Sequence, residues 1–207
     1  MSYSFEKSSS ESPQPHDESG QGAWASVWLF VWDFLKVFLL ALAIIIPIRF
    51  YLFQPFIVTG LSMQPNFHDG EYLIIDEISY RLTQPKRGDV AVIRSPADNS
   101  QFFIKRIIGL PGETVEISGG KVVIINTEHP RGTILTEDYI PSAAATFGSL
   151  KIQLSTDQFY VLGDNRLASS DSRSFGPINR SKIIGRVLLR AFPLNKFATF
   201  SAPNYAY

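Results

Sequence analysis

The sequence contains no cysteine, and its histidines are only His16, His68 and His129. Without cysteine the chain forms no disulfide and has no thiol nucleophile, a composition that is compatible with an exported domain but does not prove one. The three histidines are scattered, without the His-x-x-x-His or paired-cysteine spacing that indicates a zinc site. We therefore predict that the protein uses no metal and no other cofactor.

The sequence also lacks an excess of charge of either sign. Lysine and arginine together number 19, aspartate and glutamate also number 19, and the formal net charge is zero. Proteins that hold nucleic acid neutralise its phosphates with clustered basic residues, and no such cluster stands out here. We expect no nucleic-acid partner.

Apolar residues are scarce at the N-terminus. Residues 1–23 are rich in Ser, Gln, Gly and Pro, and Tyr3 and Phe5 are the aromatic residues that could anchor them. Such a segment cannot bury enough apolar surface to offset the entropy that ordering costs. We predict a disordered polar tail over residues 1–23.

The most hydrophobic stretch of the chain follows, over residues 24–53. Within it, residues 34–53 form a run of 20 residues that spans about 30 Å as a helix, enough to cross a bilayer. Lys36 and Arg49 lie near the ends of this run, where long side chains reach the lipid headgroups. The tryptophans recur at helical spacing and suit the membrane interface: Trp24, Trp28 and Trp32.

A cleaved signal peptide is the alternative interpretation of residues 24–53. Its start would be late, the segment before it is acidic, and Arg49-Phe50-Tyr51 offers no small-residue cleavage site. We therefore predict an uncleaved single-pass transmembrane anchor. Too few basic residues flank it to set its orientation.

Beyond the anchor, Lys105 is a cation where a buried side chain is expected. It lies in residues 102–108, Phe-Phe-Ile-Lys-Arg-Ile-Ile, whose composition predicts a strand with Phe103 and Ile107 on the face of Lys105. Burial disfavours the charged form, and a shift of about three units, roughly 4 kcal/mol, would bring its pKa near neutrality. Lys105 is thus a candidate general base. The alternative is a lysine that snorkels from a half-exposed strand or pairs with a carboxylate.

Ser62 lies in the sequence Val-Thr-Gly-Leu-Ser-Met-Gln-Pro, residues 58–65. Gly60 before it and Pro65 after it predict a constrained turn, which can expose a hydroxyl together with its own N–H. Ser62 is therefore a candidate nucleophile whose N–H is a candidate oxyanion donor. Taken alone, such a turn is more often an ordinary loop.

Two further motifs accompany these residues, Arg-Gly-Asp-Val at 87–90 and Gly-Asp-Asn-Arg-Leu-Ala-Ser-Ser-Asp-Ser-Arg-Ser-Phe-Gly at 163–176. The four blocks in this order resemble the type I signal peptidases, the membrane-bound serine proteases of the Ser-Lys dyad (leader peptidase) class. The resemblance runs from about residue 53 to about residue 189, and its most specific parts are 104–112 and 163–176. It implies a protease that removes signal peptides from secretory precursors.

The resemblance also implies roles for individual residues. Ser62 matches the nucleophile, Lys105 its general base, and Ser169 the serine that orients the lysine by a hydrogen bond. Asp171 and Arg173 match a charged pair that supports the site, and Asp164 and Arg166, which begin the same loop, match further supporting residues. Without the dyad motifs, these four would be interpreted as exposed ion pairs on a solvated loop.

The chain departs from some family members at three positions. Gly60 stands where certain members carry a serine whose hydroxyl helps to bind the oxyanion, so the Ser62 N–H needs another donor, which the sequence does not identify. Asn66 stands where threonine is common and Ala168 where asparagine is frequent. Neither of these two substitutions removes a group that the chemistry needs.

Other readings of the site stay open. A Ser-His-Asp hydrolase would need a histidine at the serine, and His68 is six residues beyond Ser62. A self-cleaving repressor of the related Ser-Lys fold is disfavoured by the anchor and by the lack of a DNA-binding segment. A membrane-anchored, non-catalytic binding module of the same fold is the alternative from another class.

The chain after residue 53 is rich in short apolar runs that are separated by Gly and Pro, which predicts strands. The predicted strands are 72–75, 90–93, 102–108, 114–117, 121–125, 159–162 and 183–189. Ser118-Gly119-Gly120 predicts a hairpin. We expect a mainly β fold, and the resemblance implies the β catalytic domain that signal peptidases share with self-cleaving repressors, with one N-terminal transmembrane helix.

We accordingly divide the chain into the tail 1–23, the anchor 24–53 and a β-rich catalytic domain 54–207. Residues 126–157 match no motif and show no clear periodicity, so we expect a small insertion there, such as a cap.

Ser62 follows Phe53 by nine residues, at most about 30 Å of extended chain. The site would therefore work near the membrane surface, on a substrate that is tethered by its own transmembrane segment. Phe53, Phe56 and Phe67 either dip into the interface or belong to the core. The family implies that the N-terminus is inside and the catalytic domain on the outer, non-cytoplasmic face. It also implies small substrate residues at the first and third positions before the scissile bond.

Overall fold

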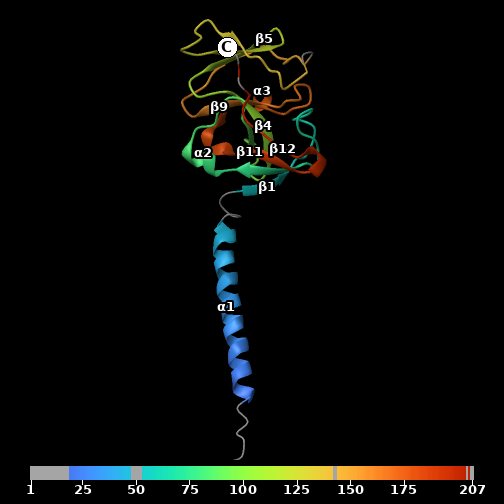
Figure 1. The fold of residues 1–207 in the computed structure, drawn as a ribbon. Coiled ribbons are helices and arrows are strands. Elements are labelled where there is room, and N and C mark those ends of the chain that lie inside the picture. Colours follow the sequence, from blue (N-terminus) through green and yellow to red (C-terminus); the bar gives the residue numbers. More distant parts are fainter. Residues whose placement is uncertain (1–18, 48–52, 142–143, 204, 206–207) are drawn as a thin grey trace, which may run out of the picture. The chain divides into compact units, whose positions relative to one another are not determined.

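The computed structural model describes residues 19–47, 53–141, 144–203 and 205 (Figure 1). The chain divides into two compact units, Met1–Ile46 and Pro47–Tyr207. Most of the predicted polar tail, residues 1–18, lies outside the described residues, as do residues 48–52 of the predicted anchor.

The first unit contains a single described helix, α1 (Ser19–Pro47). Its segment Ser26–Ile46 is long and apolar enough to cross a membrane, and its 21 residues correspond to about 32 Å of helix. Asp33 and Lys36, the charged residues inside it, form an ion pair of 3.1 Å.

The second unit is mainly β, which confirms the predicted fold class. Its large sheet has eight strands in the order β1-β2-β11-β3-β4-β9-β10, with β12 beside β11, and every pair is antiparallel. The strands are β1 (Phe53–Ile57), β2 (Tyr72–Asp76), β3 (Val90–Arg94), β4 (Phe102–Gly109), β9 (Gln158–Leu162), β10 (Ile178–Asn179), β11 (Ile183–Phe192) and β12 (Ala198–Thr199).

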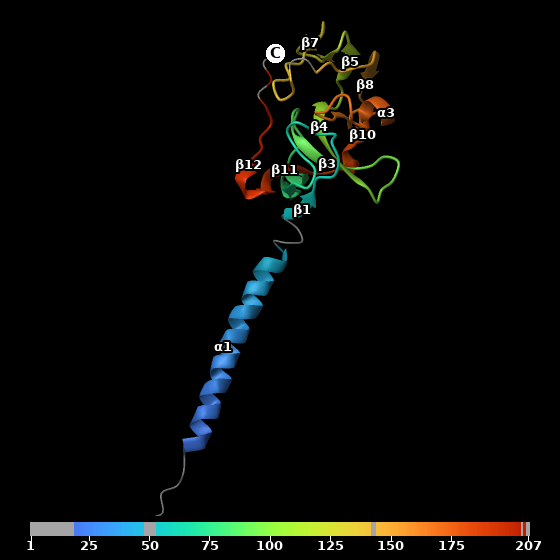
Figure 2. The same cartoon turned by 90° about the vertical axis from the view of Figure 1, so that its right-hand side faces the viewer.

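A second, four-stranded sheet has the order β7-β6-β5-β8. Its strands are β5 (Thr114–Ser118), β6 (Lys121–Ile125), β7 (Thr133–Ile134) and β8 (Leu150–Gln153). The predicted hairpin joins β5 to β6, where Gly119 and Gly120 have φ values of 58° and 78° that suit a tight turn. Residues 126–157 supply β7 and β8, which complete this sheet. The second sheet and β1 lie at opposite ends of the unit (Figures 1 and 2).

All seven predicted strands are confirmed, within a few residues at their ends. The sequence did not indicate the short strands β1, β7, β8, β10 and β12. The remaining elements of this unit are short helices: α2 (Ile78–Leu82), α3 (Ser172–Phe175), η2 (Arg180–Lys182) and η3 (Leu194–Lys196).

The core of the large sheet anchors the segment that carries Ser62. Met63 and Phe67 are 1% and 0% exposed and pack in one cluster with residues of β2, β3 and β4. The interfacial placement considered for Phe67 is therefore wrong, since this ring belongs to the core. Phe56 is half-buried and packs edge-on against Phe102, with ring centroids 5.7 Å apart.

Candidate active site

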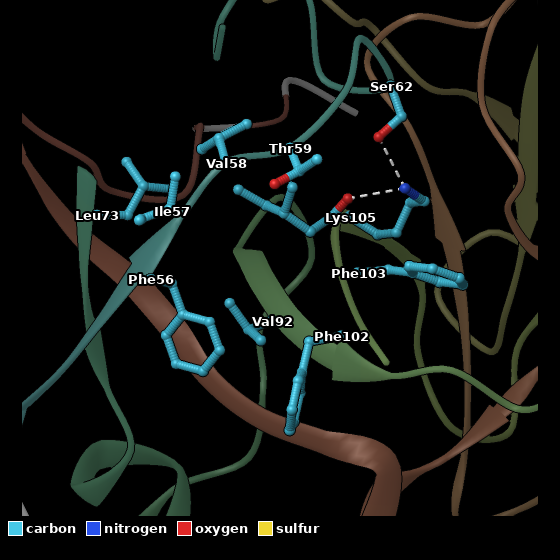
Figure 3. A pocket seen from close by; sticks show the side chains of 11 residues that line it. Phe56, Ile57, Val58, Thr59, Ser62, Leu73, Val92, Phe102, Phe103 and Lys105 are labelled. Carbon is cyan, nitrogen blue, oxygen red and sulfur yellow. Dashed lines mark hydrogen bonds between the residues drawn. The ribbon is translucent and has the colours of Figure 1, made fainter. Parts of the chain in front are cut away.

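Ser62 and Lys105 meet, although 43 residues separate them in the sequence. Lys105 Nζ donates hydrogen bonds to Ser62 Oγ and to the Ile104 carbonyl oxygen, each at 2.9 Å. Figure 3 shows the two side chains pointing toward each other, Ser62 from the turn after β1 and Lys105 from β4. A hydroxyl within hydrogen-bond distance of an amine is the arrangement of a nucleophile and its base.

Burial sets the protonation of Lys105, whose exposure is 3%. Loss of solvation lowers its pKa from 10.5 to about 8, and this effect outweighs the opposing attraction of Asp171 and Asp164. The Phe103 ring lies 5.4 Å from Nζ and forms part of its apolar surroundings. With a pKa of about 8, about a tenth of Lys105 is neutral at pH 7, and a neutral amine can accept a proton.

The turn before Ser62 is held by a carboxylate. Gly60 has φ +89°, a conformation that favours glycine, and its N–H donates to Asp69 Oδ1 at 2.7 Å. The Gly60 N–H is thus already engaged in this structure. After Ser62 the chain continues in turns, with Gln64 N donating to Leu61 O and Phe67 N donating to Met63 O.

The loop 163–176 holds the backbone of the nucleophile from the other side. Asn165 donates from its N–H to Ser62 O at 3.0 Å and from Nδ2 to Leu61 O at 3.1 Å. Gly163 allows this approach, because a Cβ there would lie 2.5 Å from Ser62 O and 2.2 Å from Ser169 Oγ. The sequence did not single out Asn165, although it lies inside the most specific motif.

Ser169 lies against Gly163, and its Oγ is buried without a hydrogen bond of normal geometry to the described residues. The hydroxyl nevertheless lies close enough to Asp171 to contribute to the lowered pKa of that carboxyl. Lys105 Nζ bonds to Ser62 and Ile104 in this structure. The orienting role of Ser169 stays a prediction.

Asp171 and Arg173 form the expected charged pair, with Arg173 Nε and Nη2 donating to Asp171 at 2.8 and 2.7 Å. Asp171 also accepts from Gly163 N at 3.0 Å and caps α3 by accepting from Arg173 N. Burial alone would raise the pKa of Asp171, but these donors outweigh it and hold the pKa below its usual range. The carboxylate therefore stays charged beside the loop glycine.

Asp164 pairs with Arg106, the residue next to Lys105. Arg106 Nε and Nη2 donate to the two Asp164 oxygens at 2.8 and 2.6 Å, and its Nη1 donates to Gly88 O at 2.8 Å. One buried pair thus joins the strand of Lys105, the 163–176 loop and the 87–90 motif. We predicted no role for Arg106 from the sequence, although an arginine directly after a buried lysine on a strand was a usable signal.

Arg166 pairs with Glu137, which lies outside every motif recognised in the sequence. Arg166 Nη1 and Nη2 donate to Glu137 at 2.8 and 2.5 Å, and the guanidinium also contacts the Thr146 hydroxyl. Asp164, Arg166 and Asp171 are 1%, 3% and 0% exposed. The interpretation of these charges as exposed pairs on a solvated loop is therefore wrong.

His68 does not contact the nucleophile. Its Nδ1 lies 3.5 Å from Glu71, a buried carboxylate that also forms a 2.7 Å ion pair with Arg190. Lys105 is the titratable group that bonds to Ser62 Oγ. His16, the histidine of the predicted tail, lies outside the described residues.

A mostly apolar cavity of about 270 Å³ opens beside the dyad. In Figure 3 Ser62 and Lys105 lie at one end of it and Phe56 and Phe102 at the other. It is lined by Phe56, Ile57, Val58, Thr59, Ser62, Leu73, Val92, Phe102, Phe103, Ile104 and Lys105. A mostly apolar cavity next to a nucleophile can hold an apolar part of a substrate.

Comparison with known proteins assigns the chain to a family. The family model described as "Signal peptidase, peptidase S26" matches residues 31–192. A signal peptidase I from Leptolyngbya laminosa is 36% identical over 178 residues, which is 82% of this chain and 83% of that protein. A probable signal peptidase I-2 from Synechocystis is 37% identical over 166 residues, 77% of this chain and 72% of that protein.

A crystal structure of a signal peptidase I from Enterococcus faecalis is 30% identical and covers 51% of this chain and 97% of its own, with a TM-score of 0.43. The family assignment rests on the sequence matches, which span most of both chains. The protein belongs to the signal peptidase family, peptidase S26.

Proposed function

We propose that this protein is a membrane-bound serine endopeptidase that removes signal peptides from secretory precursors, with Ser62 as nucleophile and Lys105 as general base. The observation that carries the proposal is the 2.9 Å contact between Ser62 Oγ and the buried Lys105 Nζ. The family assignment and the apolar helix α1 support the membrane setting.

In the proposed reaction, neutral Lys105 accepts the proton of Ser62 while Ser62 Oγ bonds to the carbonyl carbon of the scissile peptide. The oxyanion that forms is stabilised by the Ser62 N–H and by a second donor. The protonated lysine then gives its proton to the leaving amine as the C–N bond breaks, which leaves an acyl-enzyme. Lys105 next takes a proton from water, which attacks the ester, and returns that proton to Ser62 Oγ as the precursor's signal peptide leaves.

The supporting residues act through the positions of these groups. Asn165 and Gly163 fix the Ser62 backbone, and the Asp171–Arg173 pair fixes Gly163. The Arg106–Asp164 pair holds the strand next to Lys105 against the same loop. We assign Ser169 the role of orienting Lys105 during turnover, because its buried hydroxyl lies in this loop against Gly163 and makes no hydrogen bond of normal geometry with the described residues.

The cavity beside the dyad suits a substrate with small residues at the first and third positions before the scissile bond. Its lining is mostly apolar, so a charged side chain would leave polar atoms unpaired there. We place the N-terminus inside and the catalytic domain on the outer, non-cytoplasmic face, where secretory precursors emerge.

Cleavage of a secretory precursor by the detergent-solubilised full chain tests the proposal, beside Ser62→Ala and Lys105→Ala. We expect the wild type to trim the precursor and each variant to lose at least about a thousandfold in rate, the scale of a missing nucleophile or base. Thermal unfolding of each variant shows that it is folded.

Two outcomes would contradict the proposal. An inert wild type that still binds the precursor would favour the non-catalytic binding module. Full activity in Lys105→Ala would favour another base, and His68→Ala would then show whether His68 takes that role.

A further inference from the structure

Asn66 connects three separate segments of the active site. It lies on the turns that follow Ser62, four residues beyond the nucleophile. Its Nδ2 donates to Asp164 Oδ2 at 2.8 Å and to the Tyr139 carbonyl oxygen at 2.6 Å. Its own carbonyl oxygen accepts from Arg190. The nucleophile segment, the 163–176 loop and the loop after β7 therefore meet at one side chain.

The chemistry of the asparagine amide matches this place. The amide NH2 has two hydrogens, and here each faces one acceptor. A threonine hydroxyl has a single hydrogen and a shorter reach, and alanine has no donor. Because hydrogen bonds to a charged acceptor are the strong ones, the contact with the Asp164 carboxylate matters most.

The contacts of Asn66 reach both members of the dyad. On one side, the turns of residues 61–67 join Asn66 to Ser62. On the other side, Asp164 binds Arg106, which follows Lys105 on β4. The Asn66–Asp164 bond thus links the segment of the nucleophile, through Arg106, to the strand of the base.

The second acceptor, the Tyr139 carbonyl, belongs to a residue that is itself fixed. The Tyr139 ring lies 3.9 Å from Arg106 Cζ, and its hydroxyl donates to Glu137 at 2.5 Å. Glu137 in turn holds Arg166 of the 163–176 loop. The loop after β7 therefore holds the Tyr139 carbonyl in place as an acceptor for the Asn66 amide.

We infer that Asn66 is a positioning residue, which holds Ser62 Oγ at hydrogen-bond distance from Lys105 Nζ by tying the nucleophile turn to Asp164 and Tyr139. This inference rests on the proposed function of the dyad. Without the amide, the turn keeps its buried residues Met63 and Phe67 and its hydrogen bonds to Asn165, but it loses the side-chain link from Asn66 to Asp164 and Tyr139. Misplacement of reacting groups by about 1 Å can cost on the order of a hundredfold in rate.

Steady-state cleavage of a peptide substrate by the full chain tests the inference with Asn66→Ala and Asn66→Asp. We expect Asn66→Ala to lower kcat at least about tenfold with KM within about twofold, since the cavity is untouched and only alignment is lost. Asn66→Asp should lower kcat further, because a carboxylate would face Asp164 and the Tyr139 carbonyl. Asn66→Thr keeps one donor and should lie between wild type and Asn66→Ala.

Asn126→Ala is the matched control. Asn126 is also part-buried, and its Nδ2 also donates to a carboxylate in an Arg–Glu pair, that of Glu113. It directly follows β6 of the second sheet, so its loss should lower the melting temperature with kcat unchanged. Equal losses of kcat in Asn66→Ala and Asn126→Ala, or a kcat within twofold of wild type in Asn66→Ala, would overturn the inference.

Amide hydrogen exchange separates this inference from the proposed function. In Asn66→Ala we expect faster exchange in residues 61–67 and 163–166 and unchanged exchange in β11, whether or not the protein cleaves peptides. Unchanged exchange at 61–67 would overturn the positioning role. An inert wild type with the expected exchange pattern would instead count against the proposed reaction alone.

Discussion

Strand β4 carries a buried basic side chain on each of its two faces, and the two side chains have different hydrogen-bond partners. Lys105 and Arg106 are neighbours in sequence, 3% and 6% exposed, and their side chains leave the strand on opposite sides. Arg106 is held by the Asp164 carboxylate, whereas the hydrogen-bond partners of Lys105 are two neutral oxygens, Ser62 Oγ and Ile104 O. Because the two side chains are similarly buried, the difference between their pKa shifts reflects the charged partner of Arg106 and not the degree of burial.

The pKa values of Lys105 and Arg106 shift in opposite directions because their hydrogen-bond partners differ. Burial lowers the pKa of Lys105 to about 8, because Asp171 and Asp164 act on it only from a distance. Burial also lowers the pKa of Arg106, but the hydrogen bonds and charge of Asp164 outweigh it and leave that pKa raised. One face of the strand thus supplies a base, and the other supplies a permanent charge that binds the loop 163–176.

The largest expected effect comes from removing the permanent charge. Arg106→Met would leave the buried Asp164 carboxylate unpaired, which we expect to lower the free energy of unfolding by about 3–5 kcal/mol. Denaturant unfolding measures this loss. Lys151→Met is the control, because Lys151 forms an exposed pair with Glu116 whose loss should cost less than about 1 kcal/mol.

Similar losses in Arg106→Met and Lys151→Met would show that the Arg106–Asp164 pair contributes no more than a surface pair. Arg106→Lys keeps the charge but loses the two-point contact, and it should be intermediate. It also provides a measurement if Arg106→Met does not fold.

Removing the base should have the opposite effect on stability. The pKa of Lys105 is 10.5 in the unfolded reference and about 8 in the fold, so protonated Lys105 destabilises the folded state by about 3 kcal/mol below pH 8. That cost shrinks as the pH rises through the two values and is absent above them. Lys105→Met should therefore be inactive yet more stable at pH 7, by up to about 3 kcal/mol, with the gain fading near pH 10.5.

Denaturant unfolding at pH 7 and pH 10 checks the sign. Lys182→Met is the control for loss of a lysine, because Lys182 bonds to Asn99 at an exposed site, and its effect should be small at both pH values. A Lys105→Met variant that is less stable than wild type at pH 7 would mean that the contacts of Nζ outweigh its desolvation.

Some residues of this site could be predicted from the sequence and others could not, because only some of them carry a local sequence signal. Ser62 and Lys105 carry local signals, a constrained turn and a cation on an apolar strand, and the long strands have a clear composition. Glu137 and Tyr139 carry none, because their roles depend on contacts with Arg166 and Arg106 that only the folded chain creates. The short strands were missed for the same reason: β7 has two residues, and pairing with β6 defines it.

Sequence spacing also could not tell which charges pair, and the Asp171–Arg173 pair was predicted from the family resemblance alone. Asp164 and Arg166 stand two residues apart in one motif, but they bind partners in different segments, Arg106 and Glu137. Asp171 and Arg173, with the same spacing, bind each other. Pairing depends on which face of the loop each side chain leaves, and sequence spacing does not determine this.

The smallest and sharpest effect would come from giving Lys105 the partner that Arg106 already has. Phe103 lies on the same face, with its ring 5.4 Å from Nζ, so Phe103→Glu would place a carboxylate within reach of the amine. An opposite charge favours the protonated form, and we expect the pKa of Lys105 to rise by about one unit or more. In a plot of kcat against pH, the acidic limb has its midpoint near pH 8 in the wild type if Lys105 is the base. In Phe103→Glu the midpoint of this limb should move to higher pH by the same amount. At pH 7 kcat should fall about tenfold and recover at high pH.

Phe103→Gln controls for the lost ring and should leave the limb in place. A limb that moves equally in both variants would show that the apolar ring, not the absence of a carboxylate, keeps Lys105 available as a base.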